Sequence, residues 1–125
     1  MSTAAQATHV QTLAVYGHPF SSCTQKVLIA LHEYGLPFEL RNLDTAAPGN
    51  HAAAWKRRWP LAQFPVLVDG ERTVAESSIV IEHLQLAHPG PEQLIPADPA
   101  AALQVRFMDR FFDLHVMAPV HHAVG

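Results

Sequence analysis

The first part of the chain alternates short apolar runs with a segment of helical spacing. Residues 12–16 are apolar and are closed by a Gly-His-Pro sequence, which predicts a buried strand ending in a turn. After Ser21 or Ser22, either of which can cap a helix, apolar residues recur at helical spacing until Gly35 supplies a stop. Residues 38–43 alternate apolar and polar side chains, as a half-buried strand does. These segments predict a βαβ unit.

The middle of the chain predicts a short helix, a hairpin and a second helix. Residues 51–59 fit a helix that a proline ends. Residues 66–68 and 73–74 are apolar runs that flank Asp69-Gly70, a strong hairpin signal. Residues 76–88 return to helical spacing. The predicted order is βαβαββα, an α/β fold.

The last part of the chain has a different character. Four prolines within residues 89–99 predict a linker between two folding units. Residues 100–117 predict a helix too apolar to stand alone, with a stripe formed by Leu103, Phe107, Phe111 and Leu114. We therefore expect a flexible N-terminus at residues 1–11, one domain at residues 12–88, and the start of a helical unit at residues 100–125.

The composition of the chain argues against several classes of function. With 125 residues and 49% hydrophobic content, the chain is long enough to bury one core. A net charge of -3 offers no basic excess for nucleic acid or anionic lipid. Its apolar runs are far shorter than the roughly 20 residues of a membrane-spanning helix, and its start lacks the pattern of a signal peptide. We expect a cytoplasmic protein with no nucleic-acid and no membrane partner.

Neither the cysteine nor the histidines indicate a metal centre. The single cysteine, Cys23, excludes an internal disulfide and a Cys-rich metal site. The nine histidines are scattered over different predicted elements, and only His121 and His122 are adjacent. No two of them have the His-x-x-x-His spacing of zincins. The sequence therefore predicts no metal.

Three short segments carry a resemblance to a known family. They are Ser21-Ser22-Cys23-Thr24-Gln25-Lys26-Val27, Phe64-Pro65 and Glu76-Ser77. In this order they resemble the points at which the N-terminal domain of glutathione transferases holds glutathione. The resemblance covers about residues 13–117 and implies a thioredoxin-like fold. The Ser-Ser-Cys start resembles zeta-class members, the maleylacetoacetate isomerases, whereas the later segments are similar to the general bacterial branches.

The resemblance also sets expectations for the whole molecule. Members of this family normally continue into a larger all-helical domain that supplies most of the pocket for the second substrate. Residues 100–125 are accordingly identified as the first helix of a truncated C-terminal domain. The resemblance implies glutathione as co-substrate, a small electrophile as second substrate, a role in detoxification, and a homodimer.

The chemistry of this family needs a thiolate. A thiol with an ordinary pKa of about 8.5 is only a few per cent ionised at neutral pH. A hydroxyl that donates to the sulfur at a helix N-terminus stabilises the ionised form. Ser21 stands six residues before Val27, the family's spacing from its catalytic Ser or Cys to the first buried helix residue, so the resemblance implies that Ser21 is catalytic. The alternative is that Ser21 or Ser22 is only an N-cap.

Cys23 offers a competing chemistry. A cysteine of low pKa at a helix start forms a mixed disulfide with glutathione, as in the omega and beta classes and in glutaredoxins. In those proteins the cysteine occupies the place that Ser21 holds here, which favours Cys23 as a small, partly buried residue. A Cys23-dependent oxidoreductase and a non-catalytic interaction module of the same fold stand as the alternative functions.

The other two segments imply the contacts to glutathione. In the family the proline matching Pro65 is cis, and the residue before it, here Phe64 in place of the usual Val, pairs its main chain with the cysteinyl backbone. Glu76 and Ser77 open a helix, where a carboxylate suits the γ-glutamyl ammonium while a hydroxyl and free N–H groups suit its carboxylate. The plainer alternatives are a trans-proline at an edge strand and an ordinary helix start.

Several charged or polar residues are weaker candidates. Lys56, Arg57 and Gln63 are candidates for the glycyl carboxylate, although a run of basic residues is more typical of a solvated helix face. Asp109 and Asp113 are predicted to lie on a solvated face of the last helix. The alternative implied by the resemblance is that an Asp in this helix lies near the γ-glutamyl group of the partner subunit or caps local structure.

Overall fold

The computed structural model describes residues 13–120, so the predicted flexible segment 1–11 and residues 121–125 lie outside the described part. Its elements are β1 (Leu13–Gly17), α2 (Ser22–Glu33), β2 (Phe38–Asn42), α3 (Ala52–Arg58), β3 (Val66–Asp69), β4 (Arg72–Ala75), α4 (Ser77–Ala87), α5 (Pro99–Phe111) and the π-helical segment η1 (Phe112–Met117). This order confirms the predicted α/β, thioredoxin-like βαβαββα arrangement followed by a linker and a helix.

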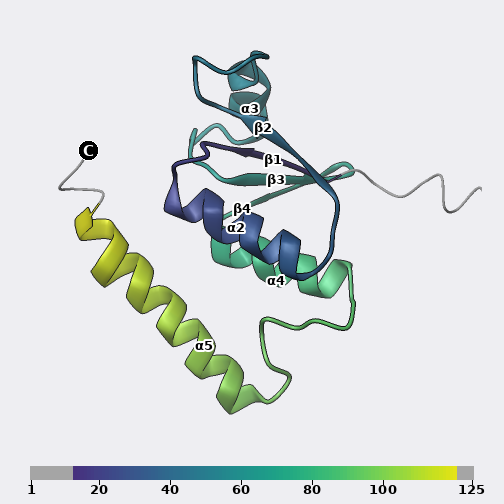
Figure 1. Ribbon diagram of the computed structural model, residues 1–125, viewed down its shortest axis with the longest axis vertical. Helices are drawn as coiled ribbons and strands as arrows, with labels where there is room; N and C mark the ends of the chain where they lie inside the picture. The colour runs from purple at the N-terminus through teal and green to yellow at the C-terminus, as the bar shows by residue number, and fades with distance from the viewer. Residues whose placement is uncertain (1–12, 121–125) are drawn as a thin grey trace, which may run out of the picture.

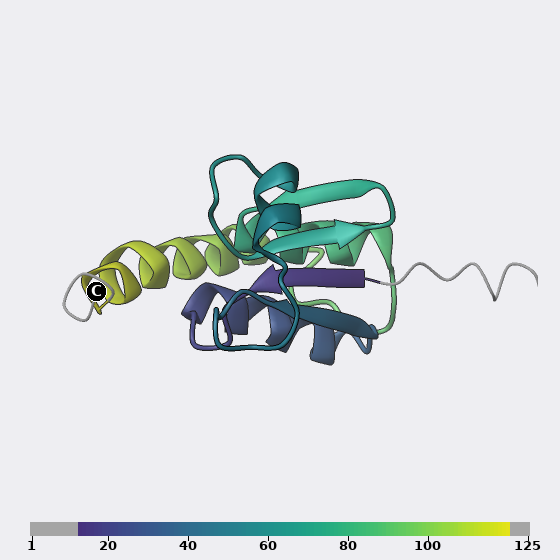
Figure 2. The same ribbon diagram turned by 90° about the horizontal axis from the view of Figure 1, so that it is seen from above.

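The four strands form one sheet in the order β2-β1-β3-β4. β1 and β2 are parallel, as a strand–helix–strand crossover requires, and β3 runs antiparallel to both β1 and β4. α2 and α4 cover one face of this sheet and α3 covers the other (Figures 1 and 2). The central strands β1 and β3 are therefore buried on both sides.

The central strand β1 explains why residues 12–16 form a continuous apolar run. Its side chains alternate between the two faces of the sheet. Leu13 and Val15 join the core beneath α2 and α4, which also contains Val27, Leu31, Leu67, Val74, Val80 and Leu84. Ala14 and Tyr16 join the smaller core on the other side, with Val66 and Val68 and with Leu43, Ala54, Trp55 and Trp59 packed against it. A strand buried on both faces shows no alternation of polar residues.

α2 ends where the sequence predicts. Gly35 has a φ of 70°, a value that favours glycine. The Leu36 N–H donates to the Leu31 carbonyl at 3.0 Å, and the Gly35 N–H donates to the His32 carbonyl at 3.1 Å. These bonds close the helix in the manner of a Schellman motif.

The predicted hairpin is present, but its turn lies one residue later than the sequence indicates. Asp69 pairs with Arg72 as the last residue of β3, so the loop is Gly70-Glu71. Asp69 belongs to the strand because its carboxylate is buried against α4. There the Nε2 atoms of His83 and His88 donate to the same Oδ2 atom at 2.9 and 2.8 Å. These two histidines are therefore not scattered, because the fold brings them to one carboxylate.

The last helix extends to the end of the described residues and changes its winding on the way. Asp98 is the N-cap of α5, accepting from the Ala101 N–H at 2.9 Å, and Pro99 occupies the first helical position. After α5 the helix continues through the wider η1 turn. Figure 1 shows α5 running past α2 and α4, so that its C-terminal end approaches the start of α2. This course places one helix end beside the segments that the sequence singles out.

Candidate functional site

One hollow, called here the site hollow, brings together the three segments singled out in the sequence. It has a volume of about 390 Å³ and lies where the starts of α2 and α4 meet the loop before β3 and the far end of the α5–η1 helix. Its walls consist of Ser21, Cys23, Trp59, Gln63, Phe64, Pro65, Ala75, Glu76, Ser77, Arg110, Asp113, Met117 and Ala118. All five predicted site residues therefore line one space.

Ser21 is the N-cap of α2. Its backbone is extended and its Oγ accepts a hydrogen bond from the Thr24 N–H at 3.2 Å. Accepting that bond uses an oxygen lone pair and leaves the hydroxyl hydrogen available. The two interpretations of Ser21 are therefore compatible, since the same hydroxyl can cap the helix and donate to a sulfur in the hollow.

Cys23 lies in the first turn of α2 and is partly buried. It is also part of the wall of the site hollow. Cys23 and Ser21 therefore line the same space. The residue considered for thiolate stabilisation and the residue considered for disulfide exchange therefore belong to one site.

The loop before β3 is held in place by contacts with Trp55 of α3. The Phe64–Pro65 peptide bond is cis. The Nε1 atom of Trp55 donates to the Gln63 carbonyl at 2.9 Å, and the rings of Trp55 and Phe64 lie 6.1 Å apart. Within residues 13–120, the Phe64 main chain forms no backbone hydrogen bond. A bound ligand with peptide groups would find an N–H and a carbonyl there without partners.

Glu76 and Ser77 form the start of α4. Glu76 has a φ of 74° and a ψ of 116°, a backbone conformation that a residue with a side chain rarely adopts. Its side chain forms no capping bond. Ser77 is the first residue of the helix and is only 8% exposed. Since the first N–H groups of a helix lack intrahelical partners, this corner presents donors beside a carboxylate.

The weaker candidates separate from one another in the structure. Gln63 lines the site hollow, whereas Lys56 and Arg57 are exposed on α3 and are not part of its wall. Trp59 also lines the hollow, although no sequence signal pointed to it. It reaches the site because it follows α3 and packs against the core on that side of the sheet.

The predicted solvated face for Asp109 and Asp113 is wrong. The Lys26 ammonium donates to Asp109 Oδ1 at 2.6 Å and to Asp113 Oδ2 at 3.1 Å. The Asp109 and Asp113 side chains are 25% and 22% exposed. Helical spacing places both carboxylates on one side of the helix, but their partner is remote in the sequence and only the tertiary fold supplies it. Asp113 and Arg110 reach the wall of the site hollow.

The electrostatics of Asp109 reflect this pairing. Burial works to raise the pKa of the carboxyl group, but hydrogen bonds from Lys26 and Ser78 together with the Lys26 charge outweigh it. The pKa of Asp109 therefore lies below its ordinary value. The carboxylate is held ionised inside a partly buried network.

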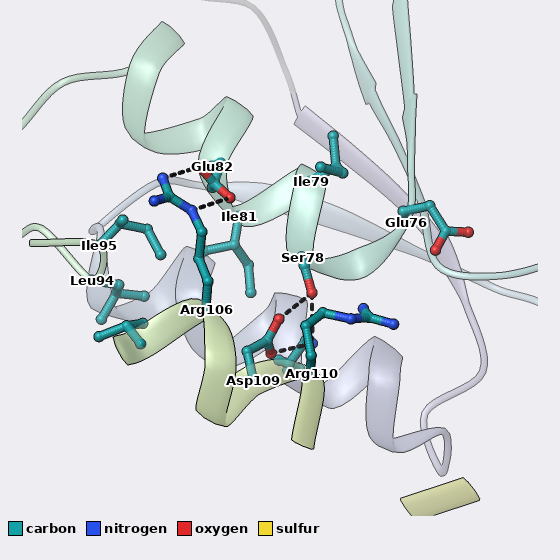
Figure 3. Close-up of a pocket in the computed structure, with 12 residues that line it drawn as sticks. Glu76, Ser78, Ile79, Ile81, Glu82, Leu94, Ile95, Arg106, Asp109 and Arg110 are labelled. Atoms are coloured by element: carbon teal, nitrogen blue, oxygen red, sulfur yellow. Dashed lines mark hydrogen bonds and ion pairs between the residues drawn. The ribbon is translucent and has the colours of Figure 1, made fainter. Parts of the chain in front are cut away.

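A second hollow of about 420 Å³, called here the apolar hollow, lies between α4 and α5. Figure 3 shows Leu94 and Ile95 on its wall, with Arg106 reaching across to Glu82. The guanidinium donates to that carboxylate at 2.7 and 3.2 Å. Glu76 and Arg110 belong to the walls of both hollows, so α4 and α5 shape both spaces.

The described residues contain neither a candidate metal centre nor a candidate membrane span. Across residues 13–120, no group of three or more His, Cys, Asp or Glu side chains is placed to hold a metal ion. Over the same residues, the helices lack the length and apolar character needed to cross a bilayer.

Comparison with known proteins decides the family. The model of the glutathione S-transferase N-terminal domain matches residues 15–92, more than half of the chain. The chain belongs to the glutathione S-transferase family. The resemblance read from the sequence is thereby confirmed.

Relatives within the glutathione S-transferase family come from plants and bacteria. A glutathione S-transferase of Silene vulgaris is 38% identical over 77 residues, covering 62% of this chain and 36% of that protein. A probable maleylacetoacetate isomerase of Vibrio cholerae is 33% identical over 114 residues, covering 90% of this chain and 51% of that protein. The crystal structure of rice GST1 in complex with glutathione is 31% identical with a TM-score of 0.74, covering 85% of this chain and 49% of that one. The chain thus spans between a third and about half of the length of these relatives.

Proposed function

We propose that the chain binds glutathione in the site hollow and activates its thiol for attack on a small electrophile. The observation that carries this proposal is the convergence of Ser21, the Phe64-Pro65 pair and the Glu76-Ser77 corner on a single space. Membership of the family and the rice relative solved with glutathione support the same ligand.

Each wall of the site hollow suits one part of the tripeptide. The Glu76 carboxylate pairs with the γ-glutamyl ammonium, and the Ser77 hydroxyl and N–H bind the γ-glutamyl carboxylate. The free main-chain groups of Phe64 pair with the cysteinyl backbone. Gln63 precedes Phe64 and lines the same hollow, and we propose it as the contact for the glycyl end.

This orientation directs the cysteinyl sulfur of glutathione toward the start of α2. There the Ser21 hydroxyl donates to the sulfur, and the positive end of the α2 dipole favours negative charge. Both effects stabilise the thiolate relative to the thiol. The thiol proton passes to solvent, and a lone pair of the thiolate then forms the C–S bond to the electrophilic carbon of the second substrate while the leaving group departs with the electron pair of the bond that breaks.

Three variants of Ser21 separate its capping role from its donor role. Ser21→Ala removes both, Ser21→Asp keeps a capping oxygen but no hydroxyl, and Ser21→Thr keeps both. The full chain is titrated with glutathione by calorimetry, and the thiolate absorbance of bound glutathione is followed against pH. We expect Ala and Asp to lower the bound thiolate fraction with little change in affinity, and Thr to retain it. Equal thiolate absorbance in all four proteins would reject the catalytic role, and the absence of heat with wild type would reject the site.

Cys23 supports one second candidate function, because it lies in the wall of the same hollow. A thiol oxidoreductase would form a mixed disulfide between Cys23 and glutathione, releasing a reduced thiol from the disulfide substrate. Disulfide exchange activity that Cys23→Ser abolishes and Ser21→Ala leaves intact would favour this function. Glutathione binding without either activity would favour a non-catalytic module.

The proposal extends to assembly and location. We propose a homodimer, supported by Leu103 and Phe107, which are 68% and 59% exposed on α5. We further propose a cytoplasmic role in the detoxification of electrophiles, which agrees with the single, unpaired Cys23 and the expected co-substrate.

A further inference from the structure

Lys26 links three helices through a single ammonium group. Its Nζ donates to Ser78 Oγ at 3.2 Å, to Asp109 Oδ1 at 2.6 Å and to Asp113 Oδ2 at 3.1 Å. Ser78 in turn donates to Asp109 Oδ2, as Figure 3 shows. A lysine ammonium has three N–H groups, so this arrangement satisfies all of them within the protein.

The hydrogen-bonded network of Lys26, Ser78, Asp109 and Asp113 reaches the wall of the site hollow. Lys26 lies on the turn of α2 that follows Ser21 and Cys23, and Ser78 directly follows Ser77. Asp113 belongs both to the network and to the wall of the hollow. Lys26, Ser78 and Asp109 line the apolar hollow, so the network extends from one hollow to the other and joins α2 and α4 to the α5–η1 helix.

An ion pair that joins α5 to α4 rather than to α2 provides a natural comparison. Its partners are Arg106 and Glu82, whose side chains are 47% and 30% exposed, and neither lines the site hollow. The Lys26 and Asp109 side chains are 24% and 25% exposed. A more buried pair with several hydrogen bonds is screened less by solvent and loses more when one partner is removed.

We propose that Lys26 is a positioning residue that couples occupation of the site hollow to the docking of the α5–η1 helix. This inference rests on the proposed binding of glutathione. The walls of the hollow come from the α2 and α4 starts on one side and from Arg110, Asp113 and Met117 on the other. A ligand that contacts both sides favours the docked arrangement, and docking that is held by Lys26 favours the ligand by the same free energy.

The test compares Lys26→Met with the matched control Glu82→Gln in the full chain. Glutathione affinity is measured by calorimetry, and amide hydrogen exchange of α5 and η1 is measured with and without glutathione. We expect Lys26→Met to weaken glutathione about tenfold, a size typical of coupling between two sites, and to abolish the slowing of η1 exchange that glutathione causes in wild type. Glu82→Gln is expected to retain both the affinity and the slowing. Lys26→Arg, which keeps the charge, is expected to restore much of both.

Two further variants keep the inference open to test if Lys26→Met fails to fold. Asp113→Asn removes one negative charge and Ser78→Ala removes one hydroxyl, and each leaves the Lys26–Asp109 pair in place. Both are expected to reduce the glutathione-induced slowing of exchange. If Lys26→Met or these two variants behave like Glu82→Gln, the positioning role is overturned. If wild type binds no glutathione, the proposed function itself fails, which the wild-type titration reveals before any variant is compared.

Discussion

Glu76 lines the site hollow, holds a backbone conformation with φ near 74°, and forms no capping bond through its side chain. Such conformations cost about 1–3 kcal/mol in a residue with a side chain and are found mainly at functional sites. A glycine adopts a positive φ without that steric cost. The stability of the fold should therefore depend on whether residue 76 carries a Cβ atom, whereas glutathione binding should depend on its carboxylate.

We predict that Glu76→Gly and Glu76→Ala weaken glutathione binding by about 1–3 kcal/mol, the range for a lost charge-assisted hydrogen bond. Glu76→Gly should be at least as stable as wild type because it relieves the strain, whereas Glu76→Ala retains it. Ser77→Ala should weaken binding by about the same amount as either variant. Calorimetry and urea unfolding measure the two effects separately. Unchanged affinity in all three folded variants would refute the assignment of this corner to the γ-glutamyl group.

Asp69 is a second carboxylate, beside Asp109, whose pKa is set by partners that the fold supplies. Burial works to raise the pKa of its carboxyl group, but hydrogen bonds from His88 and His83 outweigh it, so the pKa lies below the ordinary value of 3.8. A carboxyl group with a lowered pKa stabilises the fold fully above its unfolded pKa and loses that contribution as pH falls through its folded pKa.

We predict that Asp69→Asn lowers the free energy of unfolding at neutral pH by about 1–3 kcal/mol, since two histidine donors lose their charged acceptor. The stability advantage of wild type over this variant should be complete above pH 3.8 and should shrink as pH falls further. Denaturant unfolding at several pH values measures this. The control is Glu92→Gln, which changes an exposed carboxylate in the linker. A difference between wild type and Asp69→Asn that is constant with pH would contradict the pairing.

Some residues of the site hollow were predictable from the sequence because local signals mark them, whereas others were not. Ser21, Pro65 and Ser77 stand at positions marked by local signals: a helix start, a strand start and a second helix start. Arg110 and Asp113 reach the site hollow only through the path of α5 across α2 and α4. No local pattern encodes that path.

At the scale of elements, the contact between β1 and α2 is unusually close. A Cβ atom on Gly17 would lie 2.6 Å from Cγ2 and 2.7 Å from Oγ1 of Thr24, whose side chain is fully buried. This close approach brings the end of β1 against the first turn of α2. Ser21 and Cys23, which lie between Gly17 and Thr24 in the sequence, are thereby set at the wall of the site hollow.

We predict that Gly17→Ala destabilises the chain by about 1–3 kcal/mol, as overpacking a tight core does. It should also weaken glutathione activation, because the start of α2 must move away from the strand. Gly90→Ala is the matched control, since a Cβ atom there meets no neighbour within 4 Å. Thermal unfolding and thiolate absorbance report the two effects. Equal stability of the two alanine variants would show that β1 and α2 can move apart to accommodate the Cβ atom without loss of folding free energy.

The elements themselves were largely predictable because their signals are local. Hydrophobic spacing, Gly35 and the proline-rich linker set the predicted order of strands and helices, which the structure reproduces. The hairpin turn shifted by one residue because the tertiary partners of Asp69 hold it in β3. The η1 segment had no signal in a sequence whose spacing also suits an α-helix.

At the scale of the whole molecule, the α5–η1 helix presents an apolar surface to solvent. Leu103, Phe107 and Leu114 are 68%, 59% and 53% exposed, and they follow one another along the helix. Fully burying one such side chain is worth about 1.5–3 kcal/mol, so a surface of this kind favours association. A second copy of the chain offers the same surface, and two copies can cover each other through a twofold axis.

We predict that the full chain sediments as a dimer or a small oligomer, and that Phe107→Lys shifts it toward monomer. Gln104→Lys is the control, because it adds the same charge to the exposed side of α5 without removing apolar surface. Sedimentation velocity over a range of concentrations measures the shift, and glutathione calorimetry on each variant shows whether the site hollow depends on association. If Phe107→Lys is monomeric and still binds glutathione like wild type, each chain holds a complete binding site and association only covers apolar surface. A wild-type chain that stays monomeric at every concentration would show that this surface remains exposed in solution, against the proposed homodimer.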